Sequence, residues 1–237
     1  MSNVERPVGR SPRAMVPFAF LIVLALASAG TAWLSSRTPA VHVGPEGVII
    51  VNAPDLAPAS SSATGASVDG VTCRSEAKEV VKFHIHAHVV VFVNGHERRL
   101  PGGIGITAPA LVQHSSAGTF FDVGLYDCLY WLHTHVNDGI VHVEAPAHGV
   151  FTLGQFFDIW RQPLGPQRAG PASGRVVVFE NGKQLTGNPR DTILRAHSNI
   201  QIDVGQPVVP FQPFTYKVTG SCGQGTNSCS TPTTQAG

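Results

Sequence analysis

The chain has 237 residues, 13% of them charged, and a formal net charge of +1. No basic stripe favours a nucleic-acid partner, and no acidic run is typical of a solvating tail. The only methionines are Met1 and Met15, so a folded domain beyond them lacks the thioether ligands of a methionine-type copper(I) carrier. Histidine is the unusual residue, with 11 copies unevenly placed.

Residues 14–34 contain no charge and are long enough to cross a bilayer as one helix. Three arginines precede them against the single Glu5, so the positive-inside rule predicts a cytoplasmic segment 1–13 and an extracytoplasmic remainder. A cleaved signal peptide is the alternative, because Ala27-Ser28-Ala29 fits the small-residue cleavage pattern. We favour a transmembrane signal anchor, since the apolar run continues beyond that site. Both alternatives deliver the same domain to the same side, secreted if cleavage occurs.

Residues 35–70 are predicted to form a flexible linker, because the stretch 57–66 is small and polar with no apolar periodicity. Residues 219–237 are rich in Gly, Ser and Thr and are predicted to be a disordered tail. One extracytoplasmic, histidine-rich β domain is therefore expected between them, over residues 71–218.

All four cysteines follow the apolar segment, and an even count in an exported chain suggests disulfides. Three pairings are possible, and we expect Cys73–Cys128 within the domain and Cys222–Cys229 in the tail. A zinc–thiolate site is less favoured because the chain has no close C-x-x-C pair.

Alternating β-branched and aromatic residues predict one long strand over 81–93. Asn94-Gly95 follows it with the strongest two-residue hairpin signal, and Asp138-Gly139 and Asn181-Gly182 repeat that chemistry. Residues 200–204 alternate as a half-buried strand.

One helix is predicted to begin at Thr152, whose capping box uses Gln155. Its aromatic stripe has helical spacing and is expected to pack in the core, and Pro163 bounds the helix. The fold class is therefore mainly β (α+β): an antiparallel sheet or sandwich of hairpins with one short helix, preceded by one transmembrane helix.

The informative histidines lie two residues apart on predicted strands, where alternate side chains share a face. A two-residue turn at Asp138-Gly139 would place His135 opposite His142 and His133 opposite Glu144. Imidazoles gathered on one patch suit zinc or copper(II), and a carboxylate beside them can ligate the ion or orient a ligand. The predicted metal ligands are His84, His86, His88, His133, His135, His142 and Glu144.

Whether residues 84–88 lie beside the 133–144 hairpin stays open at this point, so one site or two are both possible. The other histidines are interpreted as ordinary polar residues, with His197 an intermediate case that could supply a late ligand. The ordinary set comprises His42, His96, His114 and His148.

The passages HIHAHVVVFVNG and CLYWLHTHVNDGIVHVEAP, followed by FTLGQFFDIW, resemble a group of exported, histidine-rich bacterial and archaeal proteins with no established activity. The resemblance covers about residues 71–205. It implies export and supplies no function.

Three functions are compatible with these patterns. The first is a membrane-anchored module that binds a divalent transition metal. The second is a metal-dependent enzyme with three histidine ligands and Glu144 as base, although no reaction-specific motif is present. The third is an assembly module whose histidines respond to pH.

Overall fold

The structure is a computed structural model that describes residues 42–43, 49–59, 66–75, 80–107, 110–115, 118–123 and 128–216. These residues belong to the second of two compact units, Val41–Gly237; the first is Met1–Ala40. The predicted membrane segment 14–34, the tail 219–237 and the pair Cys222 and Cys229 lie outside the described residues. Within the described ranges, no helix has the length and apolar character needed to cross a membrane.

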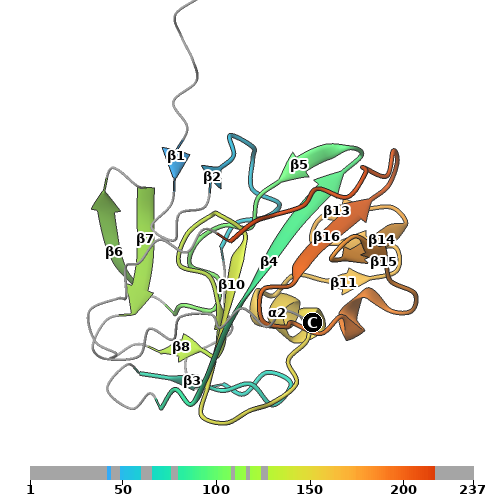
Figure 1. Ribbon diagram of the computed structural model, residues 1–237. Coiled ribbons are helices and arrows are strands. Elements are labelled where there is room, and N and C mark those ends of the chain that lie inside the picture. The colour runs from blue at the N-terminus through green and yellow to red at the C-terminus, as the bar shows by residue number, and fades with distance from the viewer. Residues whose placement is uncertain are drawn as a thin grey trace, which may run out of the picture. The chain divides into compact units, whose positions relative to one another are not determined.

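A seven-stranded sheet forms the centre of the described unit, and Figure 1 shows β4 running between β16 and β10. Its order is β15 (Lys183–Gln184), β14 (Val176–Glu180), β16 (Asn199–Val204), β4 (Phe83–Val93), β10 (Ile140–Ala145) and β9 (Leu132–His133), with β5 (His96–Arg98) also paired to β4. The expected mainly β fold with one short helix is confirmed. The sheet is mixed, however, because β16 pairs with β4 in parallel.

Strand alternation divides β4 between two environments. Ala87, Val89 and Val91 are buried in the main apolar core, whereas His84 and His86 lie on the opposite face. Strand β10 follows the same rule, with Val141 and Val143 in that core. The pleat thus places the even-numbered histidines of both strands on the face away from the core.

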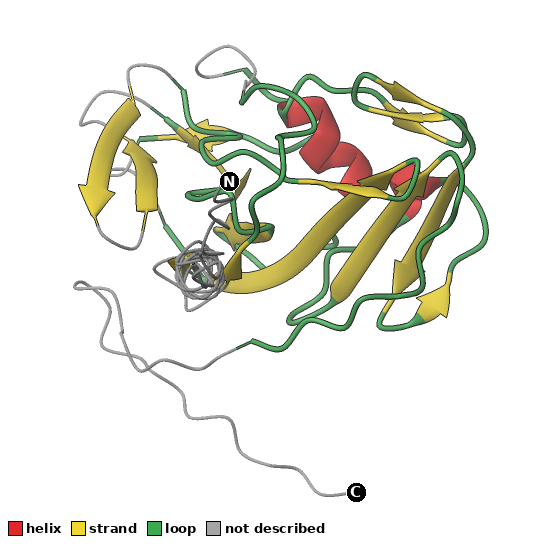
Figure 2. Ribbon diagram, turned by 90° about the horizontal axis from the view of Figure 1, so that it is seen from above, coloured by secondary structure: helices red, strands yellow, loops and turns green. Residues whose placement is uncertain are grey.

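Helix α2 (Leu153–Ile159) covers the core face of the sheet, as Figure 2 shows. The predicted capping box is present: the Thr152 hydroxyl accepts from the Gln155 backbone N–H, and the Gln155 side chain accepts from the Thr152 N–H. The predicted aromatic stripe is buried, with Leu153, Phe156, Phe157 and Trp160 all at 0% exposure. A short 3₁₀ helix, η2 (Pro189–Asp191), packs beside α2.

Smaller pairings surround the main sheet. They are β1 (His42–Val43) with β2 (Ile49–Ile50), β3 (Cys73–Arg74) with β8 (Leu129–Tyr130), β6 (Ala110–Ser115) with β7 (Gly118–Val123), and the series β11 (Leu164–Gly165), β12 (Arg168–Ala169) and β13 (Ala172–Ser173). The expected Cys73–Cys128 disulfide is present, with the two Cα atoms 5.3 Å apart. It joins β3 to the residue that immediately precedes β8.

Part of the segment predicted as a linker packs against the domain. Leu56 and Ala57 belong to the main core, and the Trp160 indole N–H donates to the Pro58 carbonyl at 2.9 Å. Asp55 pairs with Arg99 at 3.0 Å. The sequence pattern showed that the segment is rich in small residues, but it did not indicate that Leu56 and Ala57 would be buried in the core.

Candidate metal centre

Three histidines lie in a row across three neighbouring strands. His142 on β10 is directly opposite His86 on β4 on one side and His133 on β9 on the other. Glu144 is opposite His84 in the same register. The strand 83–93 therefore lies beside the 133–144 segment, and the histidines of both segments form one continuous patch.

The register at the Asp138-Gly139 turn differs from the prediction. His142 pairs with His133 rather than with His135, and residues 134–139 form a six-residue connection in place of a two-residue loop. The difference is a slip of two residues, which keeps each side chain on its predicted face because the side-chain period of a strand is two. The cluster therefore forms although the predicted turn is wrong.

Competing hydrogen bonds explain the longer connection. The Thr134 hydroxyl donates to the Pro101 carbonyl at 2.8 Å and accepts from the Ile104 N–H at 3.1 Å, while the Thr134 N–H donates to the Ile104 carbonyl. The backbone after β9 is thus paired with the 101–106 loop instead of β10. The Asp138 carboxylate in turn accepts from the Ile140 N–H at 3.0 Å, which closes a local turn before β10.

The Nε2 atoms of His133 and His135 point toward each other. The Nδ1–H of His133 donates to the Tyr130 carbonyl at 2.8 Å, and that of His135 donates to the Phe121 carbonyl at 2.6 Å. A carbonyl oxygen only accepts, so both rings carry their neutral-state proton on Nδ1. The two Nε2 atoms, 3.1 Å apart, are then both bare electron-pair donors.

Burial keeps these two rings neutral. His133 is 0% exposed, and burial, followed by the adjacent His135, lowers the pKa of His133 well below its usual range. Burial and then His142 lower the pKa of His135 to about 4. A shared proton between the two Nε2 atoms is therefore disfavoured at neutral pH, whereas a metal ion is a suitable electron-pair acceptor.

A second group of ligand atoms lies at the β4 side of the row. The Nε2 of His84 is 2.9 Å from the Nε2 of His86 and 3.0 Å from Oε1 of Glu144. The same carboxylate oxygen is 3.6 Å from Nδ1 of His142. Burial would raise the pKa of Glu144, but hydrogen bonds from His142 and His84 outweigh it and lower the pKa, so the carboxylate is ionised.

Five of these side chains, all histidines, form two overlapping triads. We call His133, His135 and His142 the inner triad, and His84, His86 and His142 the outer triad. In each, the ligand atoms lie within 4.8 Å of one another, so each can hold a metal ion. Two Zn–N bonds of about 2.05 Å to the His133 and His135 Nε2 atoms, 3.1 Å apart, would enclose an angle of about 100°. That angle is close to tetrahedral.

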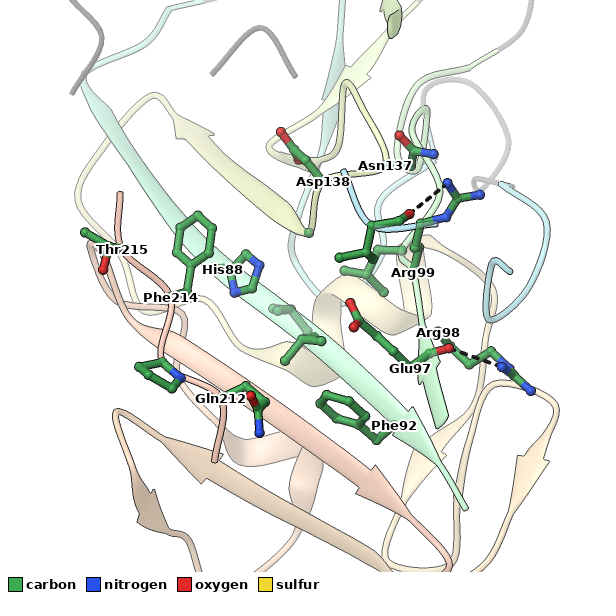
Figure 3. Close-up of a pocket in the computed structure, with 16 residues that line it drawn as sticks. His88, Phe92, Glu97, Arg98, Arg99, Asn137, Asp138, Gln212, Phe214 and Thr215 are labelled. Atoms are coloured by element: carbon green, nitrogen blue, oxygen red, sulfur yellow. Dashed lines mark hydrogen bonds between the residues drawn. The ribbon is translucent and has the colours of Figure 1, made fainter. Parts of the chain in front are cut away.

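His88 lies outside both triads. Its ring stacks on Phe214 with 3.8 Å between ring centroids, and it hydrogen-bonds the Asp138 backbone. Burial lowers the pKa of His88 to about 4. Beside it is a cavity of about 440 Å³, which the 137–139 connection also lines; Figure 3 shows His88 and Phe214 together at one end and Arg99 across from them.

Two residues of β7 support the inner triad and were not predicted. The Phe120 ring stacks on the His135 ring at 4.4 Å with planes 7° apart, and the Phe121 carbonyl fixes the tautomer of His135. The only sequence signal was an aromatic pair in a short hairpin. Nothing in the spacing indicated that this hairpin would contact the 133–135 segment.

The remaining histidines are apart from the triads within the described residues. His197 has a positive φ of 58°, and its backbone N–H donates to the His86 carbonyl at 2.7 Å. Its ring lies against Tyr216 at 4.9 Å. His197 thus contributes its backbone to the support of β4.

No protein family, curated protein or solved structure matches this chain.

Proposed function

We propose that the domain binds a divalent transition metal ion, zinc or copper(II), and that the inner triad is its primary site. Imidazole nitrogen is a preferred ligand of both ions. His142 and His133 are nearly or fully buried, at 5% and 0% exposure, and so provide a preformed site.

The observation that carries the proposal is the contact between the His133 and His135 Nε2 atoms. Both rings donate Nδ1–H to backbone carbonyls, so both Nε2 lone pairs point into a 3.1 Å gap. Buried polar atoms are normally satisfied by a partner, and two acceptors do not satisfy each other. An ion between them supplies the missing partner for both atoms at once.

The test is a metal titration of the full chain after treatment with a chelator. We expect zinc and copper(II) to bind with at least micromolar affinity by calorimetry, and elemental analysis after dialysis to find retained metal. The variant His133→Ala should lose inner-site binding, because it removes a buried ligand. The matched control His114→Ala removes an imidazole that bonds only Thr119 among the polar contacts described for it, and it should bind as the wild type does. Flat titrations with both ions would refute the proposal and favour a proton-sharing pair.

We further propose that residues 14–34 anchor the chain and that the domain works outside the cytoplasm. The Cys73–Cys128 disulfide supports this proposal, because such bonds persist in oxidising compartments. Digestion of intact cells or spheroplasts with an added protease should remove the domain. Protection until the cells are lysed would place the domain inside and contradict the proposal.

A metal-dependent enzyme is the second candidate, and the cavity beside His88 favours it. Residues 137–139 line that cavity and begin two positions after His135 in the chain. A catalytic ion needs an open coordination position. Azide added to the copper(II) form should then give a new charge-transfer band, whereas an unchanged spectrum would show a closed site and exclude this role.

A further inference from the structure

We propose that the cluster holds two metal ions and that the ring of His142 bridges them. The inference rests on the proposed function and adds a second site, formed by the outer triad together with Glu144. It also assigns His142 a role that differs from that of the other five side chains.

The strand spacing separates the two ends of the cluster. Strands β4 and β9 flank β10, and neighbouring strands are about 4.8 Å apart, so the backbones of His86 and His133 are about 10 Å apart. Ligand atoms on one zinc ion are at most about 4 Å apart, because each bond is about 2.05 Å. The ligand atoms gather in two groups that share only His142, as two ions require.

His142 lies between the two groups on the middle strand. Its ring centroid is 4.3 Å from that of His86 and 4.7 Å from that of His135. Its Nδ1 is 3.6 Å from Oε1 of Glu144, which places this nitrogen on the outer-triad side. The two nitrogens of an imidazole diverge, so in our assignment Nδ1 binds the outer ion and Nε2 binds the inner ion.

The ligand sets differ in number. The outer ion would receive four atoms: Nε2 of His84, Nε2 of His86, Oε1 of Glu144 and Nδ1 of His142. The inner ion would receive three, from His133, His135 and His142, and would keep one position for water. His142 gives up its remaining ring proton to the solvent when it bridges. The resulting imidazolate and the Glu144 carboxylate together offset two of the four positive charges.

The test is copper(II) titration of the chelator-treated full chain, followed by a count of unpaired spins by electron paramagnetic resonance. We expect two coppers per chain. We also expect fewer than two spins at low temperature, because an imidazolate bridge couples the two electrons. The double variant His84→Ala with His86→Ala should bind one copper with one full spin. The control His96→Ala removes an exposed histidine of β5 and should behave as the wild type does.

The outcomes separate the two proposals. One copper per wild-type chain would overturn the second site while leaving the proposed function intact. Failure to bind copper would overturn the bridged pair, and failure to bind either copper or zinc would overturn both proposals. Two coppers with two full spins would overturn the bridge. The wild-type stoichiometry and spin count decide the matter even if the double variant fails to fold.

Discussion

Replacement of His88 by Phe should reduce the pH sensitivity of the metal-free domain. Burial lowers the pKa of His88 to about 4 in the folded protein, whereas an unfolded chain titrates near 6.5. The unfolded state therefore binds more protons as the pH falls below 6.5, so stability decreases with falling pH until about pH 4. Phe keeps a ring against Phe214 and removes the titrating nitrogen.

The magnitude follows from the two pKa values. Between pH 7.5 and pH 5.0, a group whose pKa falls from 6.5 to about 4 removes about 2 kcal/mol of stability. Loss of the hydrogen bond to Asp138 changes the stability of His88→Phe at every pH, so the readout is the difference between the two pH values. His133 and His135 should add their own losses in both proteins, because burial lowers their pKa as well.

The assay is urea unfolding in the presence of a chelator at pH 7.5 and pH 5.0. The decrease in free energy of unfolding should be about 2 kcal/mol smaller in His88→Phe than in the wild type. Metal stoichiometry should not change, because His88 lies outside both triads. An equal decrease in both proteins would refute the assigned burial of His88, and loss of metal would show that His88 is a ligand.

Three other substitutions, one of them with a matched control, test the support of the site. Gly105→Ala places a Cβ against the Leu132 carbonyl at a φ of +75° and should lower the free energy of unfolding in urea by about 3 kcal/mol. The control Gly70→Ala has a similar φ of +80° but open space around it, and it should lower that free energy by about 1 kcal/mol. Equal losses would contradict the close packing of Gly105 against Leu132. Phe120→Ala removes the ring stacked on His135 and should weaken zinc binding about fivefold by calorimetry, so unchanged affinity would show that the stack has no positioning role. Cys73→Ser removes the disulfide that closes a 55-residue loop and should lower the free energy of unfolding by about 4 kcal/mol. A loss below about 1 kcal/mol would show that the disulfide does not restrict the unfolded chain as expected.

Local patterns predicted the long strand β4, helix α2 and two of the hairpin turns. The hairpins at Asn94-Gly95 and Asn181-Gly182 form two-residue loops with positive φ at all four residues, because this turn chemistry is satisfied within the hairpin itself. Helix α2 could also be predicted from neighbouring residues, since its capping box and its apolar stripe are contiguous in the chain.

Long-range partners decided what the sequence pattern left open. The predicted two-residue turn at Asp138-Gly139 was wrong because Thr134 forms hydrogen bonds with the distant 101–104 loop. Strand β16 was expected to be half-buried, yet Gln201 and Asp203 are also buried, because they bond to each other and to residues 209–212. The contact of β4 with β10 likewise arises from tertiary packing. It brought six of the seven predicted ligand side chains together and left His88 aside.

A crystal structure of the metal-loaded protein, with anomalous scattering measured at the zinc and copper edges, would test the inner triad most directly. We expect an anomalous peak about 2.0–2.1 Å from the Nε2 atoms of both His133 and His135, with His142 as a third ligand. A second peak on the other side of His142 would support the bridged pair. Metal-loaded crystals with no peak between the His133 and His135 rings would contradict the inner triad as the primary metal site.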